Sequence, residues 1–185
     1  MPKCDKKEKR IFSADEIKKL WEHSDNPNVQ IILFMIYTGV RVGELLALKK
    51  QDIHLDDGYI IGGEKTEAGR NRVIPLPPNI PELKKYLSSW IDKSSKDKIF
   101  CISYQKFCDG FYKGLAEAGI VSDKTENHPT PHSTRHTFAS ISAAAGMQPE
   151  NLQKIIGHAS YSTTAEIYIH QDIETLKSEM AKLVR

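Results

Sequence analysis

Apolar residues recur at helical spacing from the start of the chain. Residues 12–24 contain a capping box, because Ser13 precedes Glu16 by three positions and an apolar face follows. Residues 28–39 are apolar almost throughout and stop at Gly39, which is typical of a buried helix that ends on a left-handed glycine. Helical spacing also marks residues 41–50, 79–91, 103–119, 131–146, 148–158 and 172–184.

The pattern changes to β-type runs within residues 52–77. The stretches DDG and EAGRN, at 56–58 and 67–71, are turn signals between these runs. Pro75 and Pro77 end the last run, because proline cannot donate to a sheet ladder. The sequence therefore predicts an α+β domain that is mainly helical and carries a small antiparallel three-stranded sheet at one edge.

Length and composition set the class of protein. A chain of 185 residues with 39% hydrophobic residues is enough for one domain with its own core. Its three cysteines lack metal-like spacing and are interpreted as reduced thiols of a cytoplasmic protein. No apolar run reaches membrane-spanning length. Residues 1–10 are basic, lack the apolar region of a signal peptide and are interpreted as a linker or tail.

Charge alone does not identify a partner. The formal net charge of +2 neither requires nor excludes nucleic acid, because the distribution of charge over the surface decides binding. The candidate chemistry must therefore come from individual side chains and their spacing.

Residues 130–136 place charged groups at the start of a predicted helix. Pro131 occupies its first position, and His132 and Arg135 are three apart and share one face. An arginine beside a histidine near a helix amino terminus suggests an anion site, whereas the alternative is an ordinary polar surface helix. The sequence has no HExxH motif and no obvious third ligand for a zinc site through His132 and His136.

Two further basic clusters precede that helix. Glu44 follows Arg41 by three residues and would orient its guanidinium for bidentate contact with phosphate; a plain surface ion pair is the alternative. Lys65 lies near the tip of the predicted hairpin, whose other strand carries Arg70 and Arg72. A hairpin tip can bring a lysine to a phosphate oxygen, and a solvent-exposed charged hairpin is the alternative.

The stretch IIGHASYSTTAEIYIH, residues 155–170, carries two tyrosines. Tyr161 and Tyr168 are seven residues apart, and His158 follows Gly157, which is predicted to end a helix. A phenol has a pKa of about 10 and is a poor nucleophile at neutral pH. Either tyrosine therefore needs other residues to assist any attack.

The order and spacing of these signals resemble the catalytic domain of the tyrosine recombinases, also called phage integrases. Arg-x-x-Glu follows a Thr-Gly turn, and a hairpin lysine comes next. His-x-x-Arg, Leu-x-x-x-x-Gly-His and a tyrosine ten residues past that last histidine complete the series. The resemblance runs from about Ile11 to the last helix and implies a tyrosine-recombinase-like fold.

The resemblance implies a site-specific recombinase or integrase of a phage or mobile element. Tyr168 would attack a DNA phosphodiester and form a 3′-phosphotyrosine intermediate without a cofactor or metal. The other implied roles are phosphate binding by Arg41 and Arg135, hydrogen bonding or proton management by His132 and His158, protonation of the leaving 5′-oxygen by Lys65, and support of Arg41 by Glu44. Beside Lys65, Arg70 and Arg72 are candidates for contacts with the DNA backbone.

The resemblance also bears on domains and partners. Residues 11–185 would be the catalytic domain, with the amino-terminal core-binding domain absent and residues 1–10 a basic tail. The implied partner is double-stranded DNA, bound as a homotetramer on two duplexes, with a monomer in the absence of DNA and no membrane association. The last helix would pack either on its own domain or on a neighbouring subunit.

Three other functions share part of this pattern. A type IB topoisomerase would use similar chemistry on one strand at a time, although the spacing GHASYSTTAEIY is of the phage type. A non-catalytic DNA-binding module would keep the fold without activity. A metal-dependent nuclease would use the histidines and would leave free phosphate ends instead of a covalent adduct.

Overall fold

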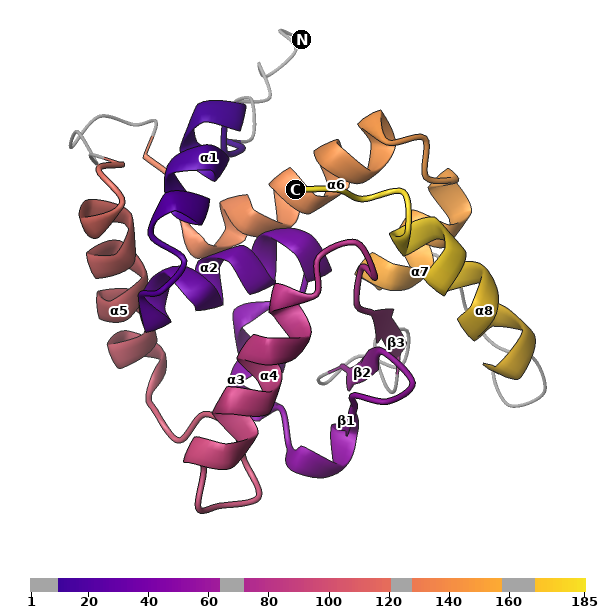
Figure 1. Ribbon diagram of the computed structural model, residues 1–185, viewed down its shortest axis with the longest axis horizontal. Coiled ribbons are helices and arrows are strands. Elements are labelled where there is room, and N and C mark those ends of the chain that lie inside the picture. Colours follow the sequence, from indigo (N-terminus) through magenta and orange to yellow (C-terminus); the bar gives the residue numbers. More distant parts are fainter. Residues whose placement is uncertain (1–9, 64–71, 121–127, 158–168) are drawn as a thin grey trace, which may run out of the picture.

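The computed structural model describes residues 10–63, 72–120, 128–157 and 169–185, with the backbone alone for 169–172. Within these ranges it confirms the predicted class, mainly helical with one three-stranded antiparallel sheet (Figure 1). The helices are α1 (Ala14–Glu22), α2 (Pro27–Thr38), α3 (Val42–Ala47), α4 (Glu82–Lys93), α5 (Tyr104–Glu117), α6 (Pro131–Ala144), α7 (Pro149–Ile156) and α8 (Ile169–Met180). A 3-10 helix, η1 (Lys50–Asp52), leads into strands β1 (Ile53–His54), β2 (Tyr59–Gly62) and β3 (Arg72–Pro75).

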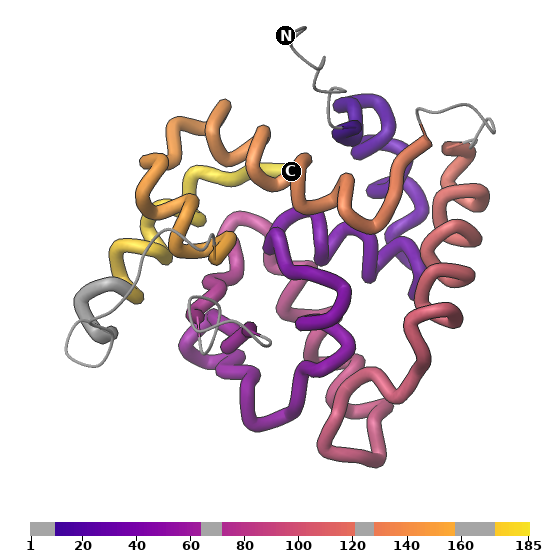
Figure 2. Tube along the Cα trace, turned by 180° about the vertical axis from the view of Figure 1, so that it is seen from behind, coloured from indigo at the N-terminus to yellow at the C-terminus, as the bar shows by residue number. Residues whose placement is uncertain are grey.

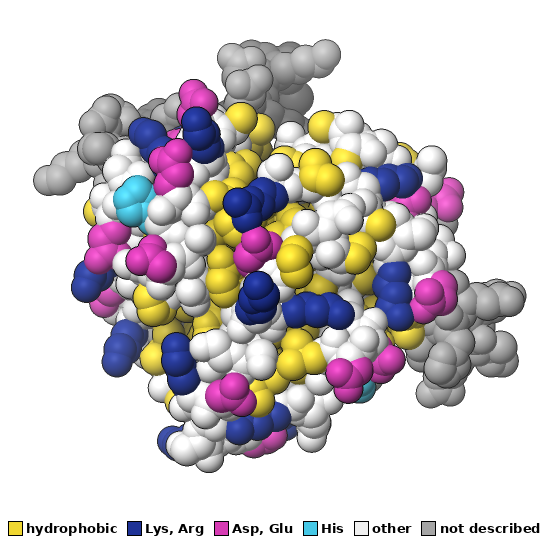
Figure 3. Space-filling model, in the orientation of Figure 1, with side chains coloured by type: hydrophobic (Ala, Val, Ile, Leu, Met, Phe, Trp, Pro, Cys, Tyr) yellow, Lys and Arg dark blue, Asp and Glu magenta, His cyan; other side chains and the backbone are white. Residues whose placement is uncertain are grey.

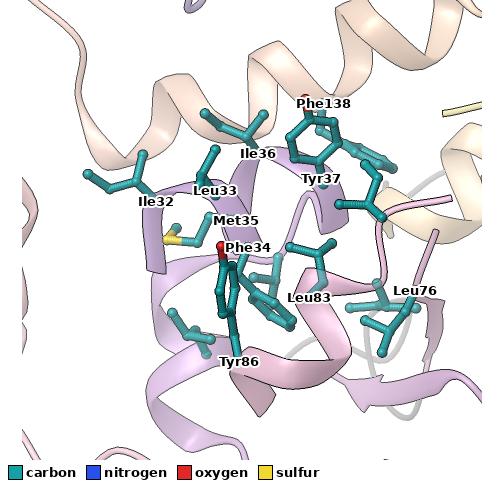
Figure 4. Close-up of a cluster of buried hydrophobic side chains, with 14 of the residues drawn as sticks. Ile32, Leu33, Phe34, Met35, Ile36, Tyr37, Leu76, Leu83, Tyr86 and Phe138 are labelled. Carbon is teal, nitrogen blue, oxygen red and sulfur yellow. The ribbon is translucent and has the colours of Figure 1, made fainter. Parts of the chain in front are cut away.

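Helix α2 is the centre of the fold because it is apolar on nearly all sides. Its residues from Ile32 to Thr38 are all buried, and it packs against α1, α4, α5 and α6. Figure 4 shows this core, in which α2 side chains meet Leu83 of α4 and Phe138 of α6. Burial of each such side chain contributes about 1.5–3 kcal/mol. None of the helices in the described ranges has the length and apolar character needed to cross a membrane.

Three helix ends form where the local sequence predicts them, whereas the helix predicted at 41–50 already ends at Ala47. The backbone N–H of Ser13 donates to Glu16 Oε2 at 2.8 Å, and the Glu16 N–H donates to Ser13 Oγ at 3.2 Å, which completes the capping box. Gly39 and Gly157 end α2 and α7 in the left-handed region, at φ 65° and 71°. These ends are encoded locally, because each depends on residues within one helical turn.

The sheet joins the two halves of the chain. Strand β2 pairs with β1 and β3, and in the second pair Tyr59 lies opposite Pro75 and Gly62 opposite Arg72. Strand β3 contacts α7 and α8, so the sheet packs beside the carboxy-terminal helices. The ribbon in Figure 1 and the Cα tube in Figure 2 both place the sheet, α7 and α8 on one side of the molecule and α5 on the other. This packing brings the start of β3 to the end of α7.

The last helix differs from its predicted bounds of 172–184. Helix α8 begins at Ile169 and ends at Met180, and the chain after it turns back onto α1. Leu183 is buried, and the Arg185 guanidinium lies 4.9 Å from the centre of the Trp21 ring. The carboxy-terminal segment therefore packs on its own chain in this structure, one of the two arrangements left open by the sequence.

Replacing Gly39 by alanine should destabilise the protein far more than replacing Gly119. Both glycines have φ +65°, so alanine at either position strains the backbone by about 1–2 kcal/mol. At Gly39, however, a Cβ would lie 2.5 Å from Phe138 Cδ1, whereas nothing lies within 4 Å of a Cβ at Gly119. Overpacking adds about 1–3 kcal/mol. Urea unfolding of both variants measures the difference, and equal losses would contradict the packing argument.

Candidate functional site

Three arginines meet at the carboxyl end of α7. They come from distant parts of the chain: Arg41 precedes α3, Arg72 begins β3, and Arg135 is the fifth residue of α6. Each donates a hydrogen bond to one of three consecutive main-chain carbonyls. The pairs are Arg72 Nε with Ile155 O at 2.8 Å, Arg135 Nη2 with Ile156 O, and Arg41 Nη2 with Gly157 O at 3.0 Å.

The end of a helix is a natural place for cations. The last carbonyls of an α-helix have no intrahelical donor, and the helix dipole makes that end partly negative. The three guanidiniums satisfy these carbonyls and complement the dipole. In turn, the carbonyls hold three like charges close together, and the packing of α2 on α6 and of β3 on α7 makes the convergence possible.

Glu44 links two of the arginines. Its carboxylate accepts hydrogen bonds from Arg41 Nη1 at 2.9 Å and from the Arg41 main-chain N–H at 2.8 Å. It also accepts hydrogen bonds from both terminal nitrogens of Arg72, and Nη2 lies 2.7 Å from Glu44 Oε2. Burial raises the pKa of Glu44, but hydrogen bonds and charge from Arg72 and Arg41 outweigh it, so the net pKa lies below the usual value.

Arg135 is buried, and its guanidinium bonds to main-chain carbonyls of two helix ends. Its Nη1 donates to the carbonyl of Gly39 at 2.8 Å, so the guanidinium joins the end of α2 to the end of α7. Burial, then the charges of Arg41 and Arg72, lower the pKa of Arg135 to about 9. The side chain therefore remains a cation at neutral pH, in a position where an incoming anion would offset the surrounding positive charge.

Exposure distinguishes the members of this cluster. The Arg41 side chain is 40% exposed, whereas that of Arg72 is 6% exposed. His132 is exposed at the start of α6, and its ring lies 4.6 Å from that of His136 in an edge-to-face contact. Of the three guanidiniums, that of Arg41 is therefore the most exposed, whereas those of Arg72 and Arg135 are buried.

The structure brings together part of the predicted site. Arg41, Glu44 and Arg135 form one connected cluster, and the buried carboxylate of Glu44 is not the plain surface ion pair that the sequence left open. The predicted residues that lie outside the described ones are Lys65, Arg70, His158, Tyr161 and Tyr168. Of their neighbours in the chain, Gly157 directly precedes His158, and α8 begins directly after Tyr168.

Arg72 has a different environment from the one predicted. The sequence suggested a DNA-backbone contact, but the structure buries the guanidinium against Glu44 and α7. The strand pattern contains a signal for this burial. Side chains two apart in a strand share a face, so Arg72 lies on the same face as Ile74, which is fully buried.

Other candidate sites lie elsewhere or are not found. A groove of about 650 Å³ between α1, the end of α6 and the carboxy-terminal tail is lined by none of Arg41, Arg72 and Arg135. The face in Figure 3 shows lysines and arginines interspersed with acidic residues and apolar side chains between them. Among the described residues, no group of three or more His, Cys, Asp or Glu side chains is placed to hold a metal ion.

The chain is similar to known proteins over most of its length. The Phage integrase family matches residues 10–175. The tyrosine recombinase XerA of Pyrococcus furiosus is 33% identical over 191 residues, which cover 98% of this chain and 64% of that protein. The chain spans less than two thirds of the first curated relatives that it matches.

Solved structures share the fold. The crystal structure of XerA recombinase has 28% sequence identity and a TM-score of 0.64, over 91% of this chain and 64% of that chain. The Tn1549 transposon integrase, solved in complex with circular intermediate DNA, has 19% identity and a TM-score of 0.67, over 94% of this chain and 66% of that chain.

Proposed function

The chain belongs to the phage integrase family, and on this premise we propose that it is a tyrosine site-specific recombinase that cleaves and rejoins DNA. Residues 11–185 would form the catalytic domain and residues 1–10 a basic linker. The observation that carries the proposal is the convergence of Arg41 and Arg135 on the end of α7. Two guanidiniums held side by side suit a phosphodiester, which places negative charge on two oxygens.

In the proposed reaction Tyr168 gives up its phenolic proton to His132, His158 or water, and its phenolate oxygen attacks phosphorus. The P–O5′ bond breaks as a P–Oη bond forms, and the leaving 5′-oxygen takes a proton from Lys65. The product is a 3′-phosphotyrosine, and attack by another DNA 5′-hydroxyl reverses the step and releases the tyrosine. One phosphoester is exchanged for another, so the reaction needs no energy source.

Charge stabilisation is the main task of the protein groups. Phosphoryl transfer depends on positioning and on stabilising charge at the equatorial oxygens. Arg41 uses one N–H of each terminal nitrogen for Glu44 and Gly157, and each nitrogen carries a second N–H. Arg41 and Arg135 would donate to the phosphate, with His132 and His158 as further donors or proton carriers.

The proposed partner is double-stranded DNA, bound by a homotetramer on two duplexes. The Tn1549 integrase, which shares this fold, was solved with DNA. Affinity should come mainly from lysine and arginine contacts with phosphates and should fall steeply as salt rises. Arg70 remains a candidate for such a contact, whereas we assign the buried Arg72 to the interior of the site.

The test is a search for a covalent protein–DNA adduct in the presence of a chelator. The 185-residue chain is incubated with a pool of nicked duplexes of randomised sequence and EDTA, then denatured. We expect an adduct that mass spectrometry locates on Tyr168. DNA binding without an adduct would favour a non-catalytic module. Cleavage to free phosphate ends that occurs without chelator and is lost in its presence would favour a metal-dependent nuclease. Relaxation of supercoiled plasmid without site preference would favour a topoisomerase.

Replacing Arg135 by glutamine should slow adduct formation by about 10²–10³-fold, the usual cost of losing one preorganised donor to a transition-state oxyanion. Arg135 is buried, so rates are compared below the melting temperature of each variant, with circular dichroism to verify folding. Arg185→Gln is the control, because Arg185 contacts Trp21 and Glu82 away from the site. A rate within threefold of the unmodified chain would contradict the role of Arg135.

A further inference from the structure

Among the described residues, the side chain of Arg72 makes three hydrogen bonds, whereas those of Arg41 and Arg135 make two each. Its Nε donates to the carbonyl of Ile155 at 2.8 Å, and its two terminal nitrogens grip the two oxygens of Glu44 as a fork. The side chain is only 6% exposed. All three nitrogens are thus engaged, on a carboxylate on one side and a helix end on the other.

The carboxylate that Arg72 grips is the one that orients Arg41. Glu44 Oε1 accepts from Arg41 Nη1, and Oε2 accepts from the Arg41 main chain. With both oxygens also held by Arg72, the carboxylate has little freedom to rotate. The direction of the Arg41 guanidinium is therefore determined by two successive contacts that start at β3.

Arg72 also sets the position of the last turn of α7. Its Nε bond to Ile155 lies two residues before Gly157, whose carbonyl accepts from Arg41. A Cβ at Gly157 would lie 2.9 Å from Arg72 Cδ and 3.3 Å from its Nε. Arg72 therefore packs directly against this glycine. Glu44 and Gly157, the two residues that the Arg41 guanidinium contacts, are thus both in contact with Arg72.

Stability alone is a poor explanation for this arrangement. A buried ion pair pays a large desolvation cost, and well-packed apolar residues often replace one without loss of stability. What apolar residues cannot supply is a fixed direction for a neighbouring guanidinium. A forked arginine supplies that direction, because its planar donors match a carboxylate in one orientation.

We propose that Arg72 is a positioning residue that acts through Glu44 and the end of α7 to aim Arg41 at the scissile phosphate. This inference rests on the proposed recombinase function. It assigns Arg72 no contact with DNA, so its loss should change the rate of cleavage and not the affinity for DNA. A misplacement of about 1 Å in such a site costs about 100-fold in rate.

The experiment compares Arg72→Met with Arg185→Met in adduct formation and DNA binding. We expect Arg72→Met to slow the single-turnover rate by about 100-fold, with a Kd for DNA within about twofold, and Arg185→Met to change neither. Arg72→Lys is the second variant, in case methionine prevents folding. It keeps the charge but cannot hold Glu44 and Ile155 together, so it should also be slow. A rate close to that of the unmodified chain in either folded variant would overturn the inference.

A crystal structure of the variant supplies a readout that needs no activity. We expect the contacts of Arg41 with Glu44 Oε1 and Gly157 O, 2.9 and 3.0 Å in the unmodified chain, to lengthen or break. If both contacts persist, the inference is overturned even where the variant is slow. If the unmodified chain forms no adduct with any DNA, the proposed function fails, and the structure alone then decides whether Arg72 positions Arg41.

Discussion

Replacing Tyr168 by phenylalanine should abolish covalent attachment to DNA and change the free energy of DNA binding by no more than about 0.5 kcal/mol. The substitution removes one oxygen, the atom that is proposed to attack phosphorus. Without it no P–O bond to the protein can form, so the loss should be complete. The measurement is a denaturing gel of the protein after incubation with DNA, beside a binding titration.

The matched control is Tyr161→Phe, which removes the same atom seven residues earlier. It should leave adduct formation unchanged. If the adduct persists in Tyr168→Phe and vanishes in Tyr161→Phe, the assignment of the nucleophile is wrong although the reaction class stands. If neither substitution has an effect, covalent catalysis by this stretch of the chain is excluded.

Replacing Glu44 by glutamine should cost about 3–5 kcal/mol of the free energy of unfolding, the usual effect of breaking a buried ion pair from one side. The amide nearly matches the carboxylate in shape but carries no charge, and its nitrogen cannot accept a hydrogen bond. Arg72 would remain buried without a counter-charge, and Arg41 would lose the carboxylate that orients its guanidinium. Urea unfolding at pH 7 measures the cost.

The matched control is Glu174→Gln. Glu174 also forms an ion pair, with Lys177 at 2.8 Å, but its side chain is 77% exposed. Exposed pairs contribute only about 0.2–1 kcal/mol, so this variant should unfold close to the unmodified chain. A similar cost for the two substitutions would contradict the structural account of Glu44.

The difference in the free energy of unfolding between the unmodified chain and Glu44→Gln should decrease as the pH falls. The pKa of Glu44 is below its usual value in the folded chain, because the two arginines outweigh burial. The stabilisation is therefore fully present above the unfolded pKa of about 4.3 and is lost as pH falls through the folded pKa. The two proteins should differ fully at pH 7, and the difference should begin to narrow once the pH falls below about 4.3. A constant difference from pH 7 to pH 3 would contradict this.

Local signals in the sequence determined the elements of this fold. The capping box at Ser13, the left-handed glycines and the turn at Gly58, with φ +74°, are confirmed. Each depends on hydrogen bonds or backbone angles within a few residues, so the chain encodes them without reference to distant parts. The same is true of the β-type period, which predicted the three-stranded sheet.

Local signals in the sequence predicted only part of the candidate site. The spacing of Arg41 and Glu44 indicated a pair, and the family resemblance joined Arg41 to Arg135, but nothing in the spacing placed Arg72 against Glu44, 28 residues away. That contact depends on how the fold brings β3 to α3. A strand arginine has the same local sequence whether its guanidinium reaches solvent or a buried carboxylate.

By itself the sequence determined the helices, the sheet, the family and the residues whose types suit phosphate chemistry. Only the tertiary structure decided that three guanidiniums share the end of α7 and that Glu44 is buried between two of them. The physical reason is the distance along the chain over which the interactions act. Caps and periods act over one turn, whereas the bond from Arg41 to Gly157 spans 116 residues and forms only when the core around α2 has packed.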